Sequence, residues 1–153
     1  MMKQQTLILR TLLFLYIVVV LYITLLAWNY GASLGPAGPG GRNYNLIPFR
    51  SIYRIGVFSP TILDPLRILV GNILLFVPFG FLLPAVWRHL RHALVVVLIG
   101  MGFSLMIETS QFLFTHRVAN VDDVILNSLG VWIGYGFFYV TLWLKRRIVL
   151  FHA

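Results

Sequence analysis

The sequence predicts an all-α integral membrane protein, in which a bundle of four transmembrane helices is joined by one short amphipathic helix at the external interface. Of the 153 residues, 59% are hydrophobic and only 10% are charged, and the mean hydropathy is +0.89. These values lie outside the range of ordinary soluble domains. The apolar residues also fall into four blocks of about 20, the length that crosses a bilayer. We expect one membrane domain covering residues 1–153.

The four predicted spans cover roughly residues 7–28, 68–87, 93–114 and 123–144. The first follows Lys3 and Arg10, as the apolar part of a secretory signal would. Its uncharged stretch is longer than a usual signal core, and no small-residue cleavage site follows it. We therefore expect a retained membrane anchor.

The distribution of Lys and Arg predicts the orientation. Seven of them lie near the termini or in the loop after the second span: Lys3, Arg10, Arg88, Arg91, Lys145, Arg146 and Arg147. Five lie on the other side, most of them in a long loop whose charge counts less: Arg42, Arg50, Arg54, Arg67 and Arg117. Both termini are therefore expected in the cytoplasm, with residues 29–67 and 115–122 outside.

The long external loop has two parts. Residues 31–41 are rich in Gly and Pro, which favours turns and excludes a helix. In residues 45–58, apolar side chains alternate with Arg50, Ser51 and Arg54 at helical spacing. This pattern predicts a short amphipathic helix lying in the membrane interface.

Composition excludes several classes of function. The chain has no cysteine, so it has no disulfide and no thiolate metal site. The net charge of +8 belongs to residues at span ends, which indicates contact with anionic lipids and not with nucleic acid. No nucleotide-binding loop, dinucleotide fingerprint, nucleophile elbow or zinc-protease motif is present. Any catalytic residue remains unknown.

Three of the four acidic residues, Glu108, Asp122 and Asp123, lie close together in the sequence. On the third span, Ser104, Glu108, Gln111 and Thr115 share one helix face; on the fourth, the same spacing joins Asp123, Asn127, Gly130 and Gly134. The two glycines predict close helix packing. With Asn72 on the second span, these polar residues meet at the external end.

A carboxylate in a membrane helix needs a partner, because burial of its charge is costly. For Glu108 we expect a cation: Arg117 is nearest in the sequence, and Arg50 and Arg54 are available from the amphipathic segment. Either Asp122 or Asp123 is expected to cap the start of the fourth helix.

Four strings together resemble one family. They are NLIPF at 45–49, GNILLFVPFGFLLP at 71–84, SLMIETSQ at 104–111, and an Arg-x4-Asp-Asp-x3-Asn-x2-Gly-x3-Gly pattern at 117–134. Their order and co-occurrence resemble the VanZ-like family of small bacterial membrane proteins, named for teicoplanin resistance. The resemblance implies a protein of the bacterial cytoplasmic membrane. It departs from the family at Asn120, where an additional Asp is frequent.

The resemblance and the polar stripes select one set of ligand-binding residues for an external polar site: Asn45, Pro48, Phe49, Arg50, Asn72, Glu108, Gln111, Arg117, Asp122, Asp123 and Asn127. Two interpretations of the set stay open. It is either an internal hydrogen-bond network that fixes helix register, or a pocket for a ligand, an ion or a lipid head group. No cofactor is implied, although the oxygen ligands would suit a divalent cation.

The preferred functional hypothesis is non-catalytic. It is recognition or shielding of a lipid-linked cell-wall precursor, another anionic lipid head group, or a glycopeptide antibiotic at the outer face of the membrane. The first alternative is an enzyme that acts on a lipid phosphate or head group, with a carboxylate as general base or metal ligand. The second is a transporter of ions or small solutes, which the absence of an inverted repeat disfavours.

Overall fold

The computed structural model describes residues 2–27, 44–115 and 117–151. Four long helices are α1 (Met2–Leu21), α3 (Leu63–Val86), α4 (Ala93–Phe114) and α5 (Val121–Phe151). The shorter elements are the π-helical turn η1 (Tyr22–Leu26), the strands β1 (Tyr44–Asn45) and β2 (Ala119–Asn120), the helix α2 (Arg50–Phe58) and the 3-10 turn η3 (Arg88–Leu90). The Gly/Pro-rich segment 31–41, Arg42 and the end of the first predicted span at residue 28 lie outside the described residues.

The predicted fold class is confirmed: four helices are long and apolar enough to cross a membrane, and one further helix is short. Helix α3 begins at Leu63, five residues before the predicted start of the span, and α5 continues to Phe151. Large apolar side chains such as Leu7, Phe14, Leu74 and Trp132 are exposed on the outside of these helices. In water, such an apolar surface would cause the protein to aggregate. In a membrane, the same surface contacts the hydrocarbon chains of the lipids.

Helices α3 and α5 form the centre of the bundle, because small residues let their backbones approach. A side chain at Gly130 or Gly134 of α5 would collide with the backbone carbonyl of Ile73 or Val77 on α3. Gly80 of α3 likewise lies against the backbone of Val131. The predicted packing role of the two α5 glycines is confirmed.

An aromatic cluster fills the space beside this helix pair. The rings of Phe79 and Phe103 are stacked with centroids 5.3 Å apart, and Phe76 contacts both rings. Phe76 has no exposed surface, so this cluster belongs to the dry centre of the bundle. Tyr16 of α1 joins it, and its hydroxyl donates to the carbonyl of Leu75 at 2.7 Å.

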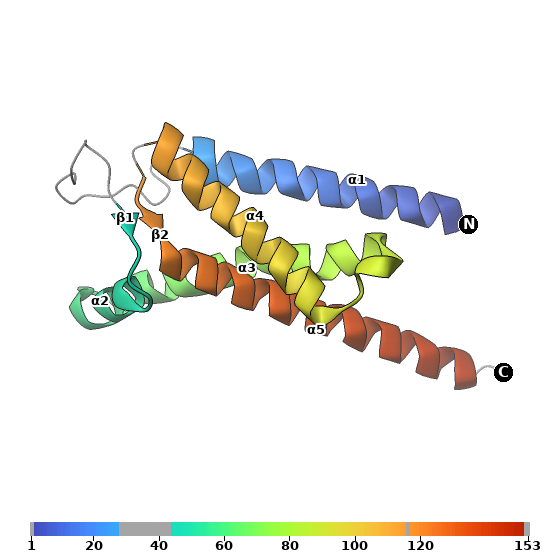
Figure 1. The fold of residues 1–153 in the computed structure, drawn as a ribbon. Helices are drawn as coiled ribbons and strands as arrows, with labels where there is room; N and C mark the ends of the chain where they lie inside the picture. The colour runs from blue at the N-terminus through green and yellow to red at the C-terminus, as the bar shows by residue number, and fades with distance from the viewer. Residues whose placement is uncertain (1, 28–43, 116, 152–153) are drawn as a thin grey trace.

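The two ends of the bundle differ in structure. Both termini lie at one end, whereas α2, β1 and β2 gather at the other, next to the start of α5 (Figure 1). The polar residues predicted to converge therefore lie near the end that carries α2, β1 and β2.

The strands β1 and β2 were not predicted. They form a parallel pair in which Tyr44 lies opposite Ala119, and Asn45 opposite Asn120. Residues 45–49 consequently do not continue α2 toward its N-terminus: the chain turns at Phe49, whose φ is 64°, and the helix begins at Arg50. The predicted amphipathic helix is shorter than 45–58, because Asn45 pairs with Asn120 and the chain turns at Phe49.

Candidate functional site

Asp122 holds the start of α2. Its Oδ1 accepts a hydrogen bond from the backbone N–H of Phe49 at 2.5 Å, and its Oδ2 accepts from those of Ser51 at 2.7 Å and Ile52 at 3.2 Å. The first N–H groups of a helix lack partners within the helix, and a carboxylate there also meets the positive end of the helix dipole. Asp122 thus caps α2, and not its own helix as predicted. It is only 1% exposed.

Asn120 connects this anchor to the bundle. Its side-chain Oδ1 accepts from the Nδ2 of Asn45 at 2.9 Å, from the hydroxyl of Ser51 and from the N–H of Asp122, both at 3.2 Å. Its Nδ2 donates to Asp123 Oδ1 at 3.2 Å, and its backbone N–H donates to Glu108 Oε2 at 2.7 Å. One amide side chain both accepts and donates here, which a carboxylate at position 120 could not do.

Arg117 holds the end of the first membrane helix. Its guanidinium donates to the carbonyls of Ile23, Thr24 and Ala27, and Gln111 Nε2 donates to the carbonyl of Thr24 at 2.9 Å. A cation suits the end of a helix, because the last carbonyls lack partners and carry partial negative charge. These hydrogen bonds join Arg117 to the end of the first membrane helix, and its expected pairing with Glu108 stays a prediction.

A polar cavity of about 210 Å³ lies between the helix ends. Four helical elements and the segment between α4 and β2 supply its polar lining, which consists of Thr24, Arg67, Asn72, Glu108, Gln111, Arg117, Asp123 and Asn127. Glu108, Gln111 and Asn127 are buried. The spacing of four residues places Asp123 and Asn127 on one face of α5, and likewise Ser104 and Glu108 on one face of α4.

Hydrogen bonds satisfy this lining only in part. Asp123 Oδ1 accepts from the amides of Asn72 at 3.1 Å and Asn120 at 3.2 Å. Asn127 donates from Nδ2 to the hydroxyl of Ser104 at 2.8 Å. Within the described part of the chain, the buried Oδ1 of Asn127 accepts no hydrogen bond. A buried acceptor without a donor lowers the stability of the fold, unless a group outside the chain donates to it.

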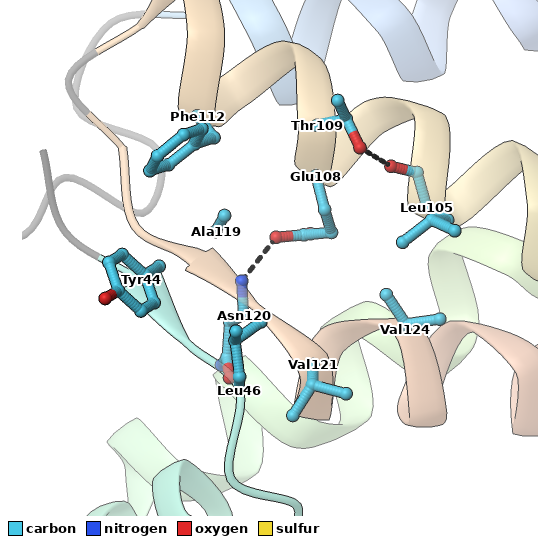
Figure 2. Close-up of a pocket in the computed structure, with 10 residues that line it drawn as sticks. All are labelled: Tyr44, Leu46, Leu105, Glu108, Thr109, Phe112, Ala119, Asn120, Val121 and Val124. Carbon is cyan, nitrogen blue, oxygen red and sulfur yellow. Dashed lines mark hydrogen bonds between the residues drawn. The ribbon is translucent and has the colours of Figure 1, made fainter.

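A second, apolar cavity of about 360 Å³ lies on another side of Glu108. Tyr44, Leu46, Leu105, Phe112, Val121 and Val124 supply most of its lining (Figure 2). Tyr44 and Phe112 meet edge to face across it, with ring centroids 6.0 Å apart. Figure 2 shows Glu108 pointing toward the backbone of Asn120, at the boundary of this space. Glu108 lines both cavities.

The predicted site residues therefore divide into groups. Asn72, Glu108, Gln111, Arg117, Asp123 and Asn127 line the polar cavity. Asn45, Asp122 and the backbone of Phe49 fasten the segment before α2. Pro48 and Arg50 are exposed, and neither they nor Arg54 belong to the described lining of the polar cavity. Of the cations proposed for Glu108, only Arg117 is in that lining.

Three polar residues of the site were missed, and one of them, Thr24, lines the polar cavity from the end of the first span. Asn120 had been noted only as a departure from the family pattern, although its place between Glu108 and Asp123 in the sequence was a usable signal. Arg67 had been counted for orientation, yet it lines the polar cavity. Its position five residues before Asn72 gave no sign of this, because that spacing does not place two residues on one helix face.

Comparison with known proteins identifies the family. A model of the VanZ/LLP1 family matches residues 13–144, which include the whole described lining of both cavities. Protein VanZ of Enterococcus faecium is 30% identical to the chain over 129 residues, which are 82% of this chain and 70% of that protein. No solved structure gives a significant match. The chain is therefore a multi-pass membrane protein that belongs to the VanZ/LLP1 family.

Proposed function

We propose that the protein recognises a lipid-linked component of the cell envelope at the outer face of the bacterial cytoplasmic membrane, without converting it chemically. One observation carries this proposal: Glu108 lines a polar cavity of about 210 Å³ and also an apolar cavity of about 360 Å³. A polar and an apolar chamber that share a residue fit an amphiphile. The head group occupies the polar chamber, and part of the hydrocarbon chain occupies the apolar one.

The orientation is part of this proposal. Lys and Arg are more numerous near the end of the bundle that holds both termini, as expected for a cytoplasmic side. The end that carries α2 then faces outward. Because the chain has no cysteine, single-cysteine variants report on one position each. A membrane-impermeant maleimide should label Leu46→Cys in intact cells, and His89→Cys only after lysis. The reverse pattern would overturn the orientation.

The binding step is tested by filling the apolar cavity. Val124→Phe adds a ring to the cavity wall on α5, so co-purified lipid in native mass spectra should decrease sharply. Val140→Phe is the matched control, because Val140 lies on the same helix but is 53% exposed. Unchanged lipid binding in a folded Val124→Phe protein would overturn the proposal. Turnover of the bound lipid by purified wild-type protein would overturn its non-catalytic part.

We include in this proposal an effect on teicoplanin susceptibility, which the family resemblance implies. Cells that express the wild-type protein should tolerate more teicoplanin than cells with an empty vector. Val124→Phe should abolish this effect at equal expression, whereas Val140→Phe should keep it. A direct, lipid-independent binding of teicoplanin to the purified protein would replace the lipid with the drug as the ligand.

A further inference from the structure

The surface that α2 turns away from the bundle is separate from both cavities, because no residue of α2 is in the described lining of either. Helix α2 packs against α3 and α5 at the end opposite the termini (Figure 1). Its less exposed residues, Ser51, Ile52 and Ile55, lie on the side toward the bundle. Three hydrogen bonds to Asp122 hold its start. The other side of α2 is therefore presented in one fixed direction.

This outer surface consists of two adjacent rows, one cationic and one apolar. Successive residues of a helix are about 100° apart, and residues four apart are neighbours on one face. Arg50 and Arg54 therefore form one row, and Tyr53 and Val57 form the row beside it. All four side chains are exposed. A cationic row next to an apolar row is typical of a helix that lies on an anionic membrane surface.

The two guanidinium groups lack a counter-charge of their own. Among the residues that the structure describes, neither side chain makes an ion pair or a hydrogen bond, and α2 contains no acidic residue. Asp64 lines a hollow of about 440 Å³ together with Arg54. Its carboxylate accepts from the hydroxyl of Thr61, and Arg67, one turn further along α3, offsets its charge. Arg50 and Arg54 thus leave an excess of positive charge at this end.

The place of α2 in the chain indicates which anions lie beside it. Exposed apolar side chains continue from the end of α2 into the first turn of α3: Phe58, Ile62, Leu63 and Leu66. Helix α3 is long and apolar enough to cross a membrane, so its hydrocarbon-facing surface begins here. This places α2 at the level of the lipid head groups, where Tyr side chains are common and phosphates are the abundant anions.

We propose that the outer surface of α2 is a second lipid site, which binds an anionic phospholipid of the adjoining leaflet. Arg50 and Arg54 donate to its phosphate, and Tyr53 and Val57 contact the hydrocarbon next to the head group. A guanidinium suits this role because its planar N–H donors match phosphate oxygens in pairs. An acidic protein in the water phase would use the arginines but not the apolar row. This site is additional to the proposed function and does not depend on the cavities.

The test uses a reporter on α2 itself. The chain has no cysteine, and a side chain at Gly56 would meet no other atom within 4 Å, so Gly56→Cys can carry a fluorescent label. The labelled full chain is placed in vesicles of equal parts phosphatidylglycerol and phosphatidylcholine, with one lipid at a time brominated to quench the label. Quenching should show a preference for the glycerol lipid of about fivefold or more, the effect of one arginine near anionic lipid.

In the same background, Arg50→Gln with Arg54→Gln should reduce this preference to about twofold or less. The melting temperature should stay unchanged, because neither side chain bonds to the described part of the chain. Arg88→Gln with Lys145→Gln is the matched control. It also removes two exposed positive charges, from η3 and from the C-terminal part of α5, and should keep the full preference.

Equal quenching by the two lipids would overturn the proposal, and the arginines would then suit an acidic partner in the water phase. A preference that survives in the double glutamine variant would also overturn it. Val124→Phe separates this site from the proposed function: it should lower the amount of co-purified lipid but leave the preference beside α2 unchanged. Loss of that preference in a folded Val124→Phe protein would mean that the lipid beside α2 belongs to the cavity, which would contradict a second site.

Discussion

Asp122 and Asp123 are neighbours in the sequence, yet they belong to two different regions of the molecule. Asp122 is 1% exposed, and three backbone N–H groups at the start of α2 donate to its two oxygens. Asp123 lines the polar cavity, where side-chain amides of Asn72 and Asn120 donate to its Oδ1. Successive residues of a helix point about 100° apart, which separates the two carboxylates.

The contrast distinguishes an anchor from a binding site. The hydrogen bonds of the Asp122 carboxylate join the start of α5 to the start of α2, so this carboxylate holds α2 in place. Around Asp123, the residues of the cavity lining include Asn127, whose buried Oδ1 has no described donor. Buried groups that a fold leaves unsatisfied are where a ligand gains most by binding. The anchor should therefore control stability, and the cavity should control ligand binding.

The largest effect is expected for Asp122→Ala. This change leaves the N–H groups of Phe49, Ser51 and Ile52 at the start of α2 without their acceptor, and we expect a loss of about 3 kcal/mol or more in stability. Thermal unfolding in detergent measures it. Asp64→Ala is the control, because its described hydrogen bond is exposed and should contribute under about 1 kcal/mol. Equal melting temperatures for the two variants would remove the distinction between anchor and cavity.

Arg117→Met should have the next largest effect. It removes the guanidinium that donates to three carbonyls at the end of the first membrane helix, at a cost of about 2 kcal/mol. Labelling of a cysteine placed at Ile23 should also become faster as this end loosens. Arg88→Met, at an exposed position of η3, should change neither quantity. If Arg117→Met affects lipid binding alone, the guanidinium does not stabilise the end of the first membrane helix.

Asn120→Asp should lower the stability of the protein moderately, because Asn120 bonds both to the segment before α2 and to Asp123. The new carboxylate cannot donate to Asp123 and is repelled by it, which we expect to cost about 1–2 kcal/mol. In the double variant Asn120→Asp with Asp123→Asn, the amide at position 123 can donate to the carboxylate at position 120. The pair again has one donor and one negative charge. A double-mutant cycle should therefore show recovery of stability. Additive losses would mean that the two side chains do not interact as described.

The smallest effect on stability is expected for the double variant Ser104→Ala and Asn127→Leu. Replacing both partners of a buried hydrogen bond with apolar groups is nearly neutral, and this change also removes the unsatisfied Oδ1, so we expect a change within about 1 kcal/mol. Lipid binding should nevertheless fall about tenfold or more. A large loss of stability would show that Asn127 serves the fold, and retained binding would show that it does not contact the ligand.

Hydrophobic block length and helical spacing were sufficient for the fold class. The blocks predicted four long helices, and the glycine spacing at Gly130 and Gly134 predicted close packing. The spacing of Ser104, Glu108 and Gln111 also placed three buried residues on one face of α4. Such features depend on the local period of a helix, and a sequence records that period directly.

The partners of these residues could not be predicted in the same way. Glu108 accepts from the backbone of Asn120, a partner that was not predicted, and Asp122 caps a helix about 70 residues earlier in the chain. Asn45 pairs with Asn120 and the chain turns at Phe49, so α2 begins at Arg50. Two-residue strands have no periodicity, so nothing in the local pattern announces them.

The sequence by itself thus determined that four apolar helices form, that polar residues gather at one end, and that Gly130 and Gly134 permit close packing. Only the tertiary structure decided which carboxylate became an anchor and which one faced a cavity. The physical reason is that helix formation and membrane insertion depend on neighbouring residues. Hydrogen-bond satisfaction inside the bundle depends instead on segments brought together from distant parts of the chain.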